Sequence, residues 1–220
     1  LRGYIGEIFD FFFQLGIDAI VTACNTSDSI LSQREKQNLP VPYFSIIDPT
    51  VRVLGSIAPK GSEVSVIATS NTVRRSLYLR KLFRYENLRR ITQKACPLFV
   101  PIIEEGIWEG EIVDAVVRYY LAEINRMEPD YLILGCTHYP FIRKVIESSI
   151  SQKTLLVDPA DHILVDLQNW IGEIDGEESL VTYYVSGNPE SFQRVLRRYF
   201  QREGDVVPVD LVDERITVRR

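Results

Sequence analysis

Residues 130–138 read DYLILGCTH and residues 18–26 read DAIVTACNT, so one short phrase occurs twice in the chain. Each copy begins with Asp, continues as an apolar run of strand length, and reaches a cysteine followed by polar residues. A buried parallel strand has this pattern. We therefore predict that Cys24 and Cys136 each lie just past the carboxyl end of a strand and before a helix, where open α/β sheets bind ligands. The repeat indicates two matched half-sites that each offer one thiol to a shared substrate.

Outward from the repeat, strand-like runs alternate with helix-like segments, which is the pattern of βαβ units in an α/β fold. The predicted strands are 19–23, 43–47, 64–68, 98–100, 131–134, 155–157 and 182–185. The predicted helices are 4–15, 29–38, 71–83, 112–127, 141–149, 162–171 and 189–200.

Two loop-like stretches suggest the domain organisation. Residues 49–61 contain the PKG phrase at 59–61, and residues 172–179 are acidic and glycine-containing. We predict a first α/β domain from 1–48 together with 158–220, and a second from 49–157. Each domain would then contain one cysteine phrase, so we expect two related domains that face each other.

Composition excludes several classes of protein. The 220 residues carry a net charge of −5, whereas a general nucleic-acid binder is usually basic. The most apolar stretch, near 9–23, is interrupted by Asp10 and Asp18, which argues against a membrane span. Three cysteines are too few, and odd in number, for a secreted disulfide scaffold, so a reducing cytoplasm fits better.

The chemistry of the site is expected to come from thiols. A cysteine between a strand and a helix meets a positive helix dipole, which favours the thiolate. His138, two residues after Cys136, is close enough to tune that thiol, whereas Cys96 has no matching phrase and is assigned to the core. A zinc site would need more ligands, a Cys-His hydrolase a single cysteine, and a disulfide oxidising conditions. A two-thiol acid/base pair uses both copies and needs no metal.

The helix after Cys24 offers Ser27, Asp28 and Ser29 as N-cap residues. Asn25, Thr26 and the following backbone amides are suited to a substrate carboxylate. Glu104, by its spacing alone, is expected to be a solvated glutamate.

Six phrases extend the pattern over nearly the whole chain: ACNT at 23–26, SVIATSNTV at 65–73, ACPLFVP at 95–101 with Glu104, LILGCTHYP at 132–140, VDPA at 157–160 and YVSG at 184–187. In this order they resemble the glutamate racemase family of the aspartate/glutamate racemase superfamily. The GCTH phrase is specific, because aspartate racemases typically carry Glu where His138 stands.

The resemblance implies two pseudo-symmetric domains with mostly parallel sheets flanked by helices and an active site in the interdomain cleft. It implies a cytoplasmic isomerase that interconverts L- and D-glutamate without a cofactor or metal, and so supplies D-glutamate for peptidoglycan, cell wall biogenesis and cell shape. The expected partner is glutamate, not nucleic acid or a membrane, and a homodimer is left open.

The resemblance also assigns roles to residues. Cys24 would take the proton from D-glutamate and Cys136 the proton from L-glutamate, with His138 as a third catalytic residue. Substrate-binding positions are Asn25, Thr26, Thr72, Thr137 and His138, and Glu104 would support the site.

Two features depart from the family. Asp28 stands where the helix after the CNT phrase usually has small residues, and it would either raise the pKa of Cys24 or cap the helix. The family's opening DSG and PYG phrases are missing, so we expect roughly fifty further residues before Leu1 and little racemisation by residues 1–220 alone. Two alternatives stay open: a related racemase for aspartate or a hydantoin, and a non-catalytic remnant on the same fold.

Overall fold

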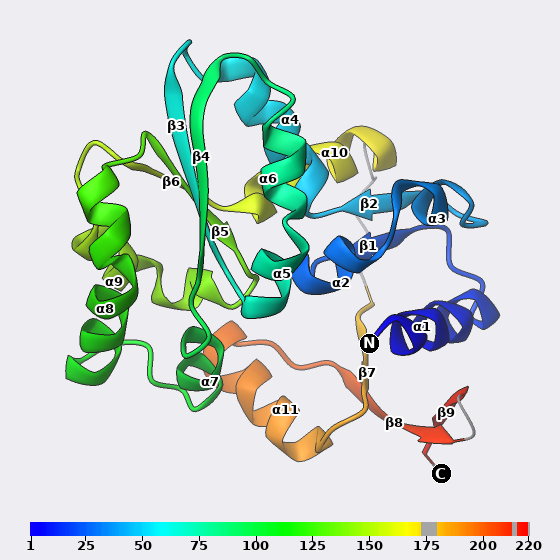
Figure 1. The fold of residues 1–220 in the computed structure, drawn as a ribbon. Helices are drawn as coiled ribbons and strands as arrows, with labels where there is room; N and C mark the ends of the chain where they lie inside the picture. The colour runs from blue at the N-terminus through cyan, green and yellow to red at the C-terminus, as the bar shows by residue number, and fades with distance from the viewer. Residues whose placement is uncertain (173–179, 213–214, 220) are drawn as a thin grey trace. The chain divides into compact units, whose positions relative to one another are not determined.

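Contacts group the chain into two compact units (Figure 1). The computed structural model describes residues 1–172, 180–212 and 215–219. One unit combines Leu1–Asp18 with Glu173–Arg220, and the other is Ala19–Gly172. All residues predicted for the site lie in the unit Ala19–Gly172.

The larger sheet of the unit Ala19–Gly172 is parallel. β3 (Ser62–Ala68) lies between β4 (Leu88–Ala95) and β5 (Tyr131–Gly135), and β6 (Leu155–Val157) pairs with the other side of β5. Ala68 of β3 is in register with Ala95 of β4 and with Gly135 of β5. These three strands therefore end level with one another, and the residues that follow them meet at one edge of the sheet.

Helices cover both faces of this sheet, as a parallel sheet requires (Figure 1). Leu132 and Leu134 of β5 pack on one face, and Ile133 packs on the other. The first face is covered by α7 (Phe99–Glu104), α8 (Glu111–Met127), the 3₁₀ turn η1 (Tyr139–Ile142) and α9 (Arg143–Ser149). The second is covered by α4 (Ile47–Ile57), α6 (Leu77–Leu82) and α10 (Pro159–Ile171), and α5 (Ser70–Arg75) precedes α6.

A small parallel sheet in the same unit consists of β1 (Ile20–Thr22) and β2 (Tyr43–Ser45). Between these strands the chain forms α2 (Asn25–Ile30) and α3 (Gln33–Gln37). Two short strands bury little surface by themselves, so this layer depends on its neighbours. β2 contacts α10, and α2 contacts α5 and α4.

These contacts explain why the compact units differ from the predicted domains. The predicted boundaries place 1–48 with 158–220, whereas 19–48 and 158–172 here pack with 49–157. The difference arises because α4 and α10 each contact elements on both sides of the predicted boundary.

The other unit has its own sheet. β7 (Thr182–Val185) runs parallel to β8 (Asp205–Val212), which is antiparallel to β9 (Arg215–Val218). α11 (Pro189–Val195) and a π-helical turn, η2 (Leu196–Phe200), connect β7 to β8. α1 (Arg2–Gln14) packs on β9, and its Phe11 ring meets Tyr184 edge-on with centroids 5.0 Å apart.

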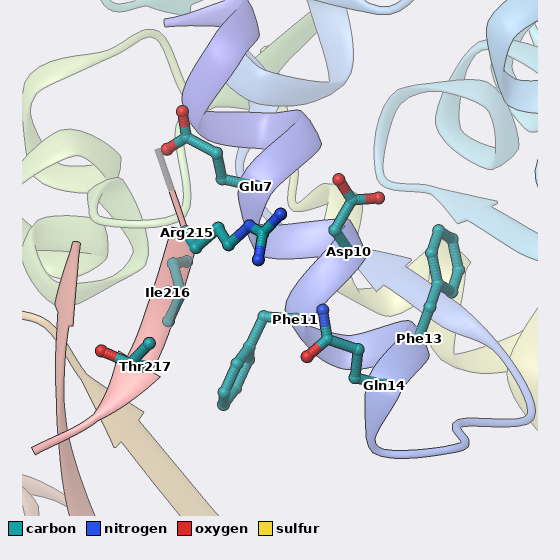
Figure 2. A pocket seen from close by; sticks show the side chains of 8 residues that line it. All are labelled: Glu7, Asp10, Phe11, Phe13, Gln14, Arg215, Ile216 and Thr217. Atoms are coloured by element: carbon teal, nitrogen blue, oxygen red, sulfur yellow. The ribbon is translucent and has the colours of Figure 1, made fainter. Parts of the chain in front are cut away.

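A cavity of about 740 Å³ lies between α1 and β9 in this unit. Figure 2 shows the Arg215 side chain directed between Glu7 and Asp10 of α1. The cavity is lined only by residues of this unit, and none of them is a residue predicted for the site.

The α/β prediction is confirmed, but two local predictions are wrong. Residues 98–100 begin α7 rather than a strand, and the strand before them is β4, whose Arg89 and Arg90 are exposed and hide its pattern. Residues 49–61 are mostly α4 rather than a loop, because Pro49 falls in the first helical turn, where its missing N–H costs nothing. The predicted loop 172–179 lies outside the described residues except for Gly172, the C-cap of α10.

Candidate active site

Cys24 occupies the position predicted for it. β1 ends at Thr22, and Cys24 is the N-cap residue of α2 with extended backbone (φ −77°, ψ 112°). Its carbonyl oxygen accepts a hydrogen bond from the Asp28 amide at 2.9 Å, the first turn of the helix. The Cys24 side chain is exposed and forms no disulfide, so its thiol is accessible to a substrate.

Cys136 follows β5 in the same way, but it is buried. The residue is 7% exposed and follows Gly135, at which an added Cβ would lie 2.9 Å from the Ile67 carbonyl oxygen. Glycine therefore lets β5 approach β3 directly before the thiol. Burial raises the pKa of Cys136 to about 11, although the neighbouring His138 amide lowers it. At neutral pH the resting Cys136 is consequently a protonated thiol.

The charge of Cys24 influences the protonation of Cys136. After burial and the His138 amide, the charge of Cys24 is the next influence on the pKa of Cys136, and it raises that pKa. The two thiols come from the carboxyl ends of strands in different sheets, β1 and β5. The repeat in the sequence thus corresponds to two matched positions within one compact unit.

His138 connects Cys136 to Glu104. The Cys136 Sγ atom lies 3.8 Å from His138 Nδ1, and His138 Nε2 lies 3.2 Å from Glu104 Oε1. If Nε2 carries the proton and donates to the carboxylate, Nδ1 is free to accept a proton from the thiol. The Glu104 side chain is 64% exposed, so its charge is partly screened by solvent. Glu104 is therefore both solvated, as its spacing predicts, and in contact with the site.

A cluster of three threonine hydroxyls holds α2 against α5. Thr26 Oγ1 lies 2.9 Å from Thr69 Oγ1 and 3.0 Å from Thr72 Oγ1, and the latter two are 3.1 Å apart. Thr69 is the N-cap of α5, where its side chain accepts from the Thr72 amide. Thr26 and Thr72 are thus brought together although 46 residues separate them.

Asn25 is anchored by a residue that sequence reasoning missed. The Tyr78 hydroxyl donates to Asn25 Oδ1 at 2.7 Å, and both residues are nearly fully buried. Asn25 Nδ2 is also buried and has no hydrogen-bond partner among the described residues. A buried donor without a partner is costly, and a ligand oxygen would satisfy it.

Of the other residues singled out in the sequence, Cys96 agrees with its assignment, Thr137 is located but its role stays a prediction, and the capping prediction for 27–29 is wrong. Cys96 is fully buried, as assigned, and burial raises its pKa to about 12. Thr137 lies exposed between Cys136 and His138. Residues 27–29 do not cap α2, since the cap is Cys24 itself, and Asp28 faces the interior with 0% exposure. Sequence analysis did not single out Thr69 or Tyr78 as site residues. Thr69 lies within the SVIATSNTV phrase, and Tyr78 lies in none of the quoted phrases.

Two negative findings concern the described residues. These residues contain no group of three or more His, Cys, Asp or Glu side chains that could hold a metal ion. Among the helices of 1–172, 180–212 and 215–219, none is both long and apolar enough to cross a membrane.

Comparison with known proteins identifies the family. Residues 8–166 match the family described as Asp/Glu/Hydantoin racemase. A glutamate racemase from Geobacter metallireducens is 34% identical over 96% of this chain and 80% of its own.

Solved structures agree with this match. A Thermus thermophilus glutamate racemase in complex with β-chloro-D-alanine has 32% identity and a TM-score of 0.79, over 96% of this chain and 79% of its own. A Francisella tularensis glutamate racemase in complex with D-glutamate has 26% identity and a TM-score of 0.82, over 95% and 80% of the two chains. With its parallel sheets, its two strand-end thiols and these similarities, the chain belongs to the Asp/Glu/Hydantoin racemase family, and the three relatives named above are glutamate racemases, a class of amino-acid racemase.

Proposed function

We propose that this protein interconverts L- and D-glutamate without a cofactor, with Cys24 and Cys136 as the two acid/base groups. The observation that carries the proposal is the pair of thiols at matched strand ends, one exposed and one buried with a raised pKa. The family and the chemistry of the relatives support glutamate as the substrate.

The reaction needs a base and an acid on opposite faces of one carbon atom. In the D-to-L direction, the Cys24 thiolate takes the Cα proton, so the C–H bond breaks and an S–H bond forms. The electron pair stays on the substrate as a planar carbanion, and Cys136 delivers its thiol proton to the opposite face. The L-to-D direction reverses these roles. Each direction therefore requires both thiols.

The different environments of the thiols suit these roles. Cys136, with its pKa raised to about 11, holds a proton ready for delivery. When Cys136 must act as the base, His138 Nδ1 at 3.8 Å can accept its proton, and Glu104 stabilises the resulting imidazolium. We therefore propose that His138 deprotonates Cys136 when that thiol must act as the base.

Substrate binding is assigned to groups around the thiols. Asn25 contributes a buried Nδ2 that has no partner among the described residues, which suits a carboxylate oxygen. Thr26 and Thr72 present hydroxyls in a connected cluster, and Thr137 is exposed beside Cys136. The Francisella relative that is solved with D-glutamate supports an amino acid of this size.

A substrate panel separates glutamate from the alternatives. The aspartate and hydantoin racemases of the wider family stay open, and a preference for aspartate over glutamate would transfer the proposal to that substrate. His138 favours glutamate because an imidazole, rather than a carboxylate, stands beside the second thiol.

The test uses the complete gene product that carries this sequence, incubated with L-glutamate in deuterium oxide. We expect deuterium at Cα of the D-glutamate formed, and loss of racemisation in both Cys24→Ala and Cys136→Ala. Cys96→Ala is the matched control, because this thiol is buried in the core. If neither L-glutamate nor D-glutamate acquires deuterium at Cα, the proposal is disproved.

The cellular role we propose is the supply of D-glutamate for peptidoglycan in the cytoplasm. Expression in a bacterial strain that requires external D-glutamate should restore growth without it. Failure of an expressed, active protein to do so would separate the catalytic activity from this role.

A further inference from the structure

A buried charged cluster lies behind the helix that carries Cys24. Asp28 of α2 is 0% exposed and Lys36 of α3 is 6% exposed. The Lys36 Nζ atom lies 2.5 Å from Asp28 Oδ1. We call Asp28, Lys36, Tyr43 and Ser45 the Asp28 cluster, since the last two also donate to this carboxylate.

The hydrogen bonds of the carboxylate reach several elements. Oδ1 accepts from Lys36 and from the Tyr43 hydroxyl at 2.7 Å, and Oδ2 accepts from the Ser45 hydroxyl at 2.6 Å. Oδ2 also accepts from the Ile47 amide at 3.2 Å, at the start of α4. Asp28 therefore ties α2 to α3, β2 and α4.

The hydrogen bonds of the Asp28 cluster are suited to hold the surrounding elements in one arrangement. Burial of a charged pair is tolerated where additional hydrogen bonds satisfy the remaining oxygen atoms, as they do here. Burial first, and then the charge of Asp28, raises the pKa of Tyr43, so its hydroxyl stays protonated as a donor. The Lys36 ammonium also lies 5.1 Å from the centre of the Tyr43 ring.

Helix α2 needs such a support. It contains six residues, and helices shorter than about 12 residues are marginal by themselves. Its first turn is held by Tyr78 through Asn25 and by α5 through Thr26. Its second anchor is Asp28, whose amide bonds directly to the Cys24 carbonyl oxygen.

We propose that Asp28 is a positioning residue for Cys24: through its buried pair with Lys36, it fixes the helix turn from which the Cys24 thiol reaches Cα. Asp28 therefore neither caps the helix nor belongs to the groups that touch the substrate. This inference rests on the proposed function, because it assigns a role toward the same two-thiol reaction.

The test compares variants of the complete gene product. Asp28→Asn removes the charge while keeping the shape, and the double variant Asp28→Ala with Lys36→Met removes the pair together, so that no buried ammonium is left alone. Glu63→Gln is the matched control, since Glu63 is a buried carboxylate paired with Arg89 and Arg90 at the amino end of β3.

The variants are expected to lose activity and to change different isotope effects in the two directions of the reaction. A displacement of Cys24 by about 1 Å should lower kcat on the order of a hundredfold, with a smaller change in KM. In the D-to-L direction, the effect of deuterium at Cα should increase, because Cys24 removes that atom. In the L-to-D direction, the solvent isotope effect should increase instead, because Cys24 then delivers a solvent-derived proton. A general loss of structure would not separate the two directions.

The outcomes are distinguishable. Wild-type protein that fails to racemise glutamate refutes the proposed function and this inference with it. Active wild type together with a folded double variant of unchanged kcat refutes the positioning role alone. Equal changes of both isotope effects in both directions also refute it, and the predicted asymmetry with an unaffected Glu63→Gln control supports it.

Discussion

The contact between His138 and Glu104 allows a graded prediction for three side chains. Glu104→Gln keeps an oxygen for His138 Nε2 but removes the charge at 3.2 Å. The two side chains are 36% and 64% exposed, and exposed ion pairs typically contribute about 0.2–1 kcal/mol. Since 1.4 kcal/mol is about a factor of ten, Glu104→Gln should lower kcat/KM by no more than about fivefold.

His138→Gln should cost far more, because it removes the group that exchanges a proton with Cys136 Sγ at 3.8 Å. General acid–base groups contribute about a hundredfold or more, so we expect at least that loss. Cys136→Ala should abolish turnover in both directions. The assay follows the circular dichroism of glutamate from each enantiomer at neutral pH.

Salt and a matched variant provide the controls for this prediction. The effect of Glu104→Gln should shrink at high ionic strength, where exposed charges are screened. Glu147→Gln removes an exposed glutamate paired with Arg143 on α9 and should leave activity unchanged. A Glu104→Gln loss as large as that of His138→Gln, or a His138→Gln variant that retains most of its activity, would refute the reasoning.

Three further predictions concern the surroundings of the thiols. Gly135→Ala should destabilise the protein by about 1–3 kcal/mol and reduce activity, because its Cβ would meet the Ile67 carbonyl oxygen at 2.9 Å; unchanged urea unfolding would contradict this. Tyr78→Phe should cost about 1–3 kcal/mol of stability and raise KM, because Asn25 loses its donor; an unaltered KM would argue against Asn25 as a substrate contact. Burial raises the pKa values of Cys136 and Cys96 from 9.0 to about 11 and about 12. The unfolded chain releases these protons first, so the free energy of unfolding should fall as pH rises from about 9 to 12, and an undiminished slope in Cys96→Ala would exclude a contribution from Cys96.

The repeated phrase allowed the carboxyl ends of β1 and β5 to be predicted because an apolar run before a small residue and Cys has few other structural readings. β4 was not predicted, because two exposed arginines, Arg89 and Arg90, interrupt its apolar pattern. α4 was mistaken for a loop because Pro49 is compatible with a first helical turn as well as with a turn between elements.

In the site, residues within local sequence phrases could be predicted, whereas residues that depend on partners distant in the sequence could not. Cys24, Cys136 and His138 lie in phrases whose order along the chain already indicates their role. Tyr78 and the Asp28 cluster could not be predicted, because their partners lie 53 and up to 19 residues away and meet only after the sheets are assembled. Asp28 was expected at a helix cap on the basis of its residue type, whereas its side chain is directed into the core.

The most direct test of the two-thiol account is the position of deuterium during the first turnovers in deuterium oxide. If one thiol removes the Cα proton and the other delivers a new one, the first D-glutamate formed from L-glutamate carries deuterium while the remaining L-glutamate does not. The same asymmetry should appear when the reaction starts from D-glutamate. Early deuterium in the unreacted enantiomer at the level found in the product would show that a single group exchanges protons on both faces, and would contradict the assignment of Cys24 and Cys136 as an opposed pair.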